Sequence, residues 1–144
     1  MTDPAAQCSC VVDTDGLHGI ANASGNLKGF LLEQLKNGVI AVPVSAWQEF
    51  EDLYEEEAAA IKAFITKRII MKRAYYVGAA RIADTLDSGF PRGAYDDNVE
   101  LNTASIASTN GYRILTSSAQ VTVYEEMGCE ASDLETWVEG VQAK

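Results

Sequence analysis

The stretch that decides the fold is SCVVDTDG, residues 9–16, in which a short apolar run meets two acidic residues. Ser9 to Val12 has the length and composition of a buried strand, and Asp13 ends it. Val39 to Val42 repeats the pattern and is closed by Pro43. Because helix-like segments separate such strands along the chain, the sequence predicts an α/β fold with a parallel sheet.

The remaining segments complete this alternation. Tyr112 to Thr116 and Val121 to Tyr124 are the other expected strands, so we predict a central parallel sheet of four to five strands in a three-layer α/β/α arrangement. Gly16, Gly19, Asn22 and Gly25 indicate a loop after the first strand. The expected helices are one carrying Leu27, Phe30, Leu31 and Leu35, one opened by a Ser45–Gln48 capping box, a hairpin of helices from Ala58 to Leu86, one from Asp96 to Asn110, and one capped by Ser132 with Glu135.

The composition indicates one globular domain. The chain has 144 residues, of which 47% are hydrophobic, so we expect a single domain over residues 1–144 with residues 1–7 as a flexible tail. No apolar run approaches the roughly 20 residues of a membrane span, and the N-terminus does not resemble a signal peptide. A cytoplasmic protein without a membrane association is therefore expected.

The cysteine pattern indicates neither a disulfide framework nor a zinc centre. Three cysteines are an odd, low number for disulfide pairing. Cys8 and Cys10 have a spacing that is unusual for structural zinc, and His18 is the only histidine.

The charge distribution is uneven. The net charge of −10 disfavours nucleic-acid binding, yet six of the eleven basic residues lie between Lys62 and Arg81. No acidic residue occurs from Ala58 to Ala83. This segment could hold a phosphate backbone, although a solvated helix face is the plainer interpretation. The candidate RNA-binding residues are Lys67, Arg68, Lys72 and Arg73.

Acidic and hydroxyl side chains gather where the predicted strands end. Asp13, Thr14 and Asp15 follow the first strand, and Thr116, Ser117 and Ser118 end the third. Helices that begin at the same edge carry Glu49, Asp96, Asp97 and Glu100. Carboxylates that meet at one point repel each other unless they are protonated or bind a cation. Oxygen ligands of this kind suit Mg²⁺ or Mn²⁺, which can activate water for phosphoryl chemistry.

The spacing of these acids resembles the PIN-domain family, which includes the VapC-type toxins of toxin–antitoxin pairs. That family opens with an apolar strand and a D-T-N or D-T-S turn, matched here by Asp13-Thr14-Asp15. A Glu follows a proline after strand two, matched by Glu49 six residues after Pro43. A helix of the form D-x-x-x-A-x-x-A-x-x-x-G is matched from Glu100 to Gly111, and the next strand ends at Thr116.

The resemblance implies a Mg²⁺- or Mn²⁺-dependent endoribonuclease. Asp13, Glu49 and Glu100 would be the catalytic acids, with Asp13, Glu100 and Asp97 as metal ligands. Thr14, Asp15, Thr116 and Ser118 would line the site. An antitoxin partner and a homodimer are also implied, as is RNA as the substrate.

The sequence departs from the family pattern at two acidic positions. Glu100 stands where the family has Asp, and Ser118 stands where it has the fourth acid. A catalytically weak or inactive PIN-like binding module is therefore the alternative.

The string from Asp13 to Gly16 also resembles the opening of haloacid dehalogenase-type phosphatases, which need a downstream Lys followed by an acidic pair. After Thr116 the only Lys is the terminal Lys144, and the only adjacent acidic pair, Glu125-Glu126, precedes it. A response-regulator receiver domain is a further alternative. It needs a phospho-acceptor Asp at the end of a middle strand and a Lys at the end of a late strand, and this sequence shows neither.

Overall fold

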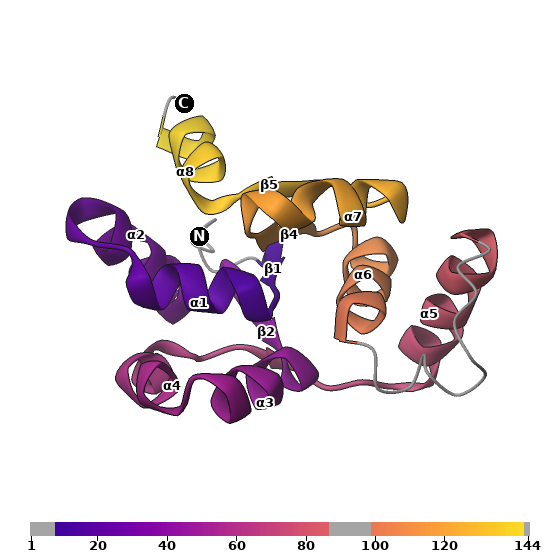
Figure 1. The fold of residues 1–144 in the computed structure, drawn as a ribbon, viewed down its shortest axis with the longest axis horizontal. Coiled ribbons are helices and arrows are strands. Elements are labelled where there is room, and N and C mark those ends of the chain that lie inside the picture. The colour runs from indigo at the N-terminus through magenta and orange to yellow at the C-terminus, as the bar shows by residue number, and fades with distance from the viewer. Residues whose placement is uncertain (1–7, 87–98, 143–144) are drawn as a thin grey trace, which may run out of the picture.

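The computed structural model describes residues 8–86 and 99–142. Its parallel sheet has five strands in the order β3-β2-β1-β4-β5 (Figure 1). The strands are β1 (Cys10–Val12), β2 (Ile40–Pro43), β3 (Arg68–Ile69), β4 (Arg113–Thr116) and β5 (Ala131–Asp133). The helices are α1 (Thr14–Asn22), α2 (Gly25–Lys36), α3 (Val44–Leu53), α4 (Glu55–Ile61), α5 (Arg73–Leu86), α6 (Val99–Asn110), α7 (Val121–Glu126) and α8 (Leu134–Gln142), with short 3₁₀ turns η2 (Lys62–Phe64) and η3 (Ser118–Gln120). The predicted α/β fold is confirmed.

Alternate residues of the central strands point into two separate cores. Cys10 and Val12 of β1 pack with α1, α2, α3, α4 and α8, whereas Val11 packs with α5, α6 and α7. This division follows from the two-residue period of a strand, and it explains why both faces of the sheet are apolar. Figure 1 shows α1 to α4 on one side of the strands and α5 with α6 on the other.

Strand β1 lies at the centre of the sheet and sets the position of the predicted site. Cys10 pairs with Ile40 of β2 on one side and with Arg113 of β4 on the other. Because all three strands are parallel, their carboxyl ends meet at one edge. Asp13 follows β1 at this edge, and Thr116 ends β4 there.

The predicted loop over Gly16 to Gly25 is wrong for most of its length, because this segment forms helix α1. Asp13 caps the helix by accepting a hydrogen bond from the Gly16 amide, and Leu17 and Ile20 are buried in the core. The glycines permit close packing. A side chain at Gly16 would overlap the Val12 side chain and the Leu115 carbonyl.

The predicted helical hairpin from Ala58 to Leu86 is also wrong in its first half. Helix α4 ends at Ile61, and the chain then crosses to β3 before α5 begins. The run from Ile65 to Ile70 is rich in β-branched residues, which favour extended backbone. The Thr66 hydroxyl donates to the carbonyls of Leu35 and Lys36 at 2.9 and 3.0 Å, so it fastens this crossing to the end of α2.

The segment from Val121 to Tyr124, predicted as a strand, belongs to helix α7 instead. The strand that pairs with β4 on the side opposite to β1 is β5. The helical period places the Tyr124 ring in the core, where it is fully buried. The last helix is capped by Asp133, which accepts from the Thr136 amide at 2.8 Å, and not by Ser132.

The cap expected at Ser45 does not form either. Helix α3 begins one residue earlier, at Val44, and has no side-chain cap. None of the described helices is long and apolar enough to cross a membrane.

We expect Gly16→Ala to lower the free energy of unfolding by roughly 1–3 kcal/mol, because the new methyl group overpacks the contact of α1 with β1 and β4. Gly29→Ala is the matched control. Gly29 lies inside α2 with open space around it, so this change should stabilise the chain by roughly 0.5–1 kcal/mol. Urea unfolding of both variants measures the two effects. Equal stability of Gly16→Ala and the wild type would contradict the packing described here.

Candidate functional site

Asp13 is the centre of a buried hydrogen-bond network. Its side chain is only 4% exposed. Oδ1 accepts from the Gly16 amide at 2.7 Å, and Oδ2 accepts from the hydroxyls of Thr116 at 2.7 Å and Tyr124 at 2.8 Å. The network therefore joins the end of β1 to α1, β4 and α7, and it holds the carboxylate in one orientation.

Burial dominates the electrostatics of Asp13. Desolvation raises the pKa of its carboxyl to about 6, although the hydrogen bonds from Thr116, Gly16 and Tyr124 oppose this shift. The charge of Asp15 raises the pKa further. The same burial, with the neighbouring Asp13 charge, raises the pKa of the Tyr124 phenol, so this hydroxyl remains a hydrogen-bond donor.

A small cavity of about 60 Å³ opens beside Asp13 at the carboxyl edge of the sheet. Three further acidic residues reach it from three helices: Asp15 from α1, Glu49 from α3 and Glu100 from α6. The complete lining is Asp13, Thr14, Asp15, Glu49, Val99, Glu100, Gln120 and Tyr124. Residues far apart in the sequence thus place four carboxyl groups around one space.

The carboxylates of this cavity influence one another. Burial raises the pKa of Glu100, and the negative charges of Asp15 and Glu49 raise it further. The Ser117 hydroxyl donates to Asp15 at 3.1 Å. Like charges that line one small cavity favour a bound proton or a bound cation.

The structure brings most of the predicted site residues together. Thr14 lines the cavity, and its hydroxyl donates to the Ala46 carbonyl at 3.4 Å, so it ties α1 to α3. Thr116 supports Asp13 from beneath the cavity. Ser118 is exposed and lines a neighbouring groove of about 610 Å³ instead. Asp97 lies outside the described residues.

Three residues of the cavity, Val99, Gln120 and Tyr124, were not predicted from the sequence. Tyr124 was assigned to a strand, and Gln120 carried no signal. A helical reading of Val121 to Glu126 would have placed Tyr124 on a buried face, but the run V-T-V favours a strand by composition.

The basic candidates lie away from the cavity. Lys67 and Arg68 belong to the crossing before and within β3, and Lys72 and Arg73 lie where α5 begins. None of these four lines the acidic cavity.

The donor set suits a hydrated cation better than a cage of three carboxylates. Among residues 8–86 and 99–142, no three Asp, Glu, His or Cys side chains form a group that could hold a metal ion. The predicted trio of Asp13, Glu49 and Glu100 is therefore not a ready coordination shell. Mg²⁺ is commonly bound by one or two carboxylates and keeps several waters, and the cavity offers oxygen donors for that arrangement.

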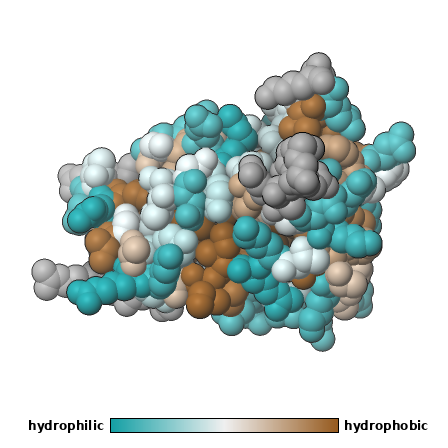
Figure 2. All heavy atoms as spheres, turned by 180° about the vertical axis from the view of Figure 1, so that it is seen from behind, coloured by the Kyte–Doolittle hydropathy of each residue, from teal (hydrophilic) through white to brown (hydrophobic). Residues whose placement is uncertain are grey.

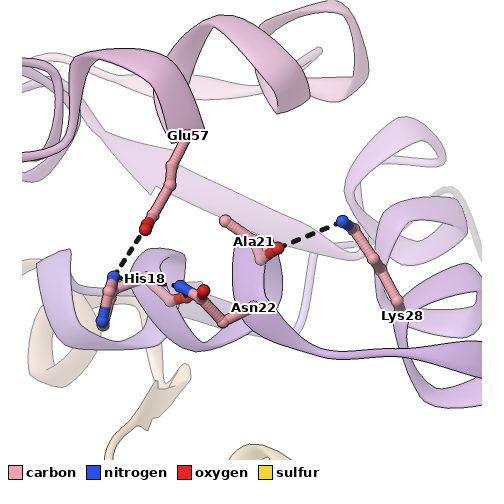
Figure 3. A network of polar contacts seen from close by, with 5 residues as sticks. All are labelled: His18, Ala21, Asn22, Lys28 and Glu57. Carbon is pink, nitrogen blue, oxygen red and sulfur yellow. Dashed lines mark hydrogen bonds and ion pairs between the residues drawn. The ribbon is translucent and has the colours of Figure 1, made fainter.

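His18 belongs to a second polar network, which braces α1 against α4 (Figure 3). Its Nδ1 lies 2.7 Å from Oε1 of Glu57, and its ring stacks on Tyr54 with centroids 4.1 Å apart. Asn22 donates to the His18 carbonyl, and Lys28 donates to the Ala21 carbonyl at 3.1 Å. These contacts fix α1, whose first turn carries Asp15.

The fold is shared with several solved structures. The crystal structure of DNA-bound VapBC from Salmonella typhimurium matches 89% of this chain and 99% of its own, with 17% sequence identity and a TM-score of 0.65. That of PAE2754 from Pyrobaculum aerophilum matches 99% of this chain and 100% of its own, with 12% identity and a TM-score of 0.63. VapBC2 from Rickettsia felis, bound to a DNA fragment from its promoter, matches 86% of this chain and 97% of its own, with 15% identity and a TM-score of 0.61. No family model and no curated protein matches the sequence significantly. At these identities the comparisons show the fold, and the predicted PIN-like fold is confirmed.

Asp13→Asn is expected to stabilise the chain at neutral pH. Between pH 3.8 and about 6 the folded protein retains a proton that the unfolded chain has released. The stabilising contribution of protonated Asp13 is therefore lost as the pH rises through about 6, at a cost of about 3 kcal/mol. The uncharged amide avoids this cost and keeps the shape of the side chain.

Urea unfolding at pH 4.5 and pH 7.5 measures this effect. The variant should be more stable than the wild type at pH 7.5, by about 1–3 kcal/mol, with a smaller difference at pH 4.5. Asp52→Asn is the control, because Asp52 is exposed on α3. The raised pKa of Asp13 would be refuted if the variant were no more stable than the wild type at pH 7.5. It would also be refuted if the difference in stability between the two proteins did not become smaller at pH 4.5.

Proposed function

We propose that this chain is a metal-dependent endoribonuclease that hydrolyses RNA at the acidic cavity. One observation carries the proposal: Asp13, Asp15, Glu49 and Glu100 line one small space at the carboxyl edge of a parallel sheet. Ligands of open α/β folds bind at this edge. The charges of Asp15 and Glu49 add to burial in raising the pKa of Glu100, and a cluster of this kind favours a divalent cation.

The four acidic residues of the cavity have two kinds of role in the proposed reaction. Glu100, together with Asp15 or Glu49, would hold Mg²⁺ or Mn²⁺ and leave positions for water and a substrate phosphate. The cation would supply an activated water and stabilise the charge that develops on the phosphate. Asp13 provides negative charge at the base of the cavity, in an orientation fixed by Gly16, Thr116 and Tyr124.

The basic residues provide a route for the RNA backbone. Lys72 and Arg73 follow the carboxyl end of β3, so they lie at the same edge of the sheet as the cavity. Both are exposed. They could attract a phosphate backbone toward an otherwise acidic protein. Lys67 and Arg68 are more distant candidates for the same role.

Two of the structural neighbours suggest a partner for this chain. They are VapBC structures from Salmonella typhimurium and Rickettsia felis, both bound to DNA. By analogy with their fold we propose that this chain is the toxin of a toxin–antitoxin pair, with an antitoxin as partner and a homodimer as its assembly.

A non-catalytic PIN-like binding module is the alternative, and two observations favour it. Both oxygens of Asp13 are already occupied by hydrogen bonds, and the fourth acidic position is the exposed Ser118, outside the cavity. A protein that had given up catalysis could keep Asp13 as a structural link.

Cleavage of single-stranded RNA with Mn²⁺ distinguishes these functions. Glu100→Gln should lower the cleavage rate at least about 100-fold, because it removes a charge that faces the cavity. Glu51→Gln is the matched control, since Glu51 is exposed on α3 and does not line the cavity. If wild type, Glu51→Gln and Glu100→Gln cleave at the same rate, or none cleaves, the nuclease proposal fails and the binding module is favoured.

Cation binding can be tested without any substrate. Mn²⁺ at millimolar concentration should raise the melting temperature of the wild type, because a ligand that binds only the folded state stabilises it. The increase should shrink in Glu100→Gln and remain in Glu51→Gln. An equal shift in all three proteins would place the cation elsewhere on the chain.

A further inference from the structure

Among the described strands, β3 is the edge strand on one side of the sheet. It pairs with β2 on one side, and it is the last strand in the order β3-β2-β1-β4-β5. In Figure 1 the magenta-to-pink segment between α4 and α5 runs along the lower margin of the molecule. We call the segment from Lys67 to Lys72, which includes β3, the basic edge. It consists of Lys67, Arg68, Ile69, Ile70, Met71 and Lys72.

The backbone of the basic edge has hydrogen-bonding capacity that the sheet does not use. The Val42 amide donates to the Lys67 carbonyl at 2.9 Å, and Val42 is the register partner of Arg68. In a parallel ladder, successive residues turn their backbone groups to opposite sides. Lys67 and Ile69 therefore face β2, whereas the amide and carbonyl of Arg68, and by alternation those of Ile70, face away from the sheet.

Three side chains of the basic edge are positively charged, and none of them forms an ion pair with another described residue. Lys67, Arg68 and Lys72 are exposed. Within the described part of the chain, the ion pairs are His18–Glu57 and Arg113–Glu130, so no described acid pairs with these cations. Arg68 stands over the Trp47 ring at 5.6 Å and Lys72 over the Tyr75 ring at 5.0 Å. The aromatic rings hold two of the charges in place.

A hydrophobic side chain lies among these cations. Ile70 is 69% exposed, the highest value of any large hydrophobic side chain in the described residues. Figure 2, which views the molecule from behind, shows hydrophobic atoms in brown reaching the lower part of this face between hydrophilic ones. An exposed isoleucine on an open edge invites contact with another chain.

We propose that the basic edge binds an extended acidic peptide segment, which adds a strand to the sheet beside β3. The free backbone groups of Arg68 and Ile70 would pair with the incoming strand. Acidic side chains of that strand would lie against Lys67, Arg68 and Lys72, and an apolar side chain would cover Ile70. Binding here does not involve the acidic cavity. It does use Lys67, Arg68 and Lys72, which the proposed function offers as RNA contacts, so a bound acidic strand would exclude RNA from these side chains.

Charge selects this occupant over a second copy of the chain. Pairing two basic edges would place cations against cations, which destabilises neighbouring strands. Lysine on an edge strand commonly prevents self-association for this reason. The cations that repel a second basic edge would attract the acidic side chains of an incoming strand.

The backbone selects a peptide over RNA. A phosphate backbone would use the cations but would leave the outward amide and carbonyl of Arg68 without the regular ladder that a strand provides. It would also leave Ile70 in water. A peptide strand satisfies the charge, the backbone and the apolar side chain together.

Backbone amide NMR with synthetic peptides tests the proposal. The first peptide alternates glutamate with valine and threonine, the second replaces each glutamate by lysine, and the third is the acidic peptide with alternate backbone nitrogens methylated. The acidic peptide should shift the Arg68 and Ile70 amide signals and slow hydrogen exchange at Arg68 by about tenfold. The lysine and methylated peptides should bind at least about tenfold more weakly.

Two variants separate the backbone contribution from the side chain. Ile70→Pro removes an amide that faces away from β2 and should abolish binding, whereas Ile70→Thr keeps that amide and should retain most of it. Lys67→Glu combined with Lys72→Glu should weaken the acidic peptide and favour the lysine peptide. Thermal unfolding confirms that each variant is folded before it is compared.

Three results would overturn the proposal. The acidic peptide could leave the Arg68 and Ile70 amides unchanged. The methylated peptide could bind as well as its parent, which would show a charge contact without an added strand. A single-stranded oligouridylate could shift these amides while the acidic peptide does not, which would assign the basic edge to nucleic acid.

Discussion

The hydrogen bonds to the Asp13 carboxylate are the constraint on which the rest of the site depends. Three donors from three elements, Gly16, Thr116 and Tyr124, converge on one side chain. Burying a carboxylate is unfavourable unless such partners are present. The network therefore fixes how α1, β4 and α7 meet β1, and this junction forms the base of the cavity that the other carboxylates line.

The same network creates a tension between structure and chemistry. A carboxylate that is held by three donors is well oriented but has little free capacity to bind a cation directly. Asp15, Glu49 and Glu100 lie on the open side of the cavity and retain that capacity. The division suggests an inner acid that organises the site and outer acids that contact what binds there. Buried charge of this kind is common where a protein gives up stability for function.

Much of this arrangement could be predicted from the sequence. The apolar run before Asp13, and the spacing of Glu49 and Glu100 from their strands, placed three acids at the correct edge. The predictions were wrong where the local conformational preference of a segment differs from the conformation that its tertiary contacts require. Val121 to Tyr124 is β-branched yet helical, because a helix brings the Tyr124 hydroxyl to Asp13, 111 positions away. Strands β3 and β5 are too short to show a two-residue period.

The cation site proposed at the cavity rests on Glu100 with Asp15 or Glu49, beside the buried Asp13. A crystal soaked in Mn²⁺ and measured for anomalous scattering tests this site directly. One peak is expected inside the cavity, within coordinating distance of Glu100 and of Asp15 or Glu49. A cavity without a peak, or a peak at acidic residues elsewhere on the surface, would contradict the proposed cation site.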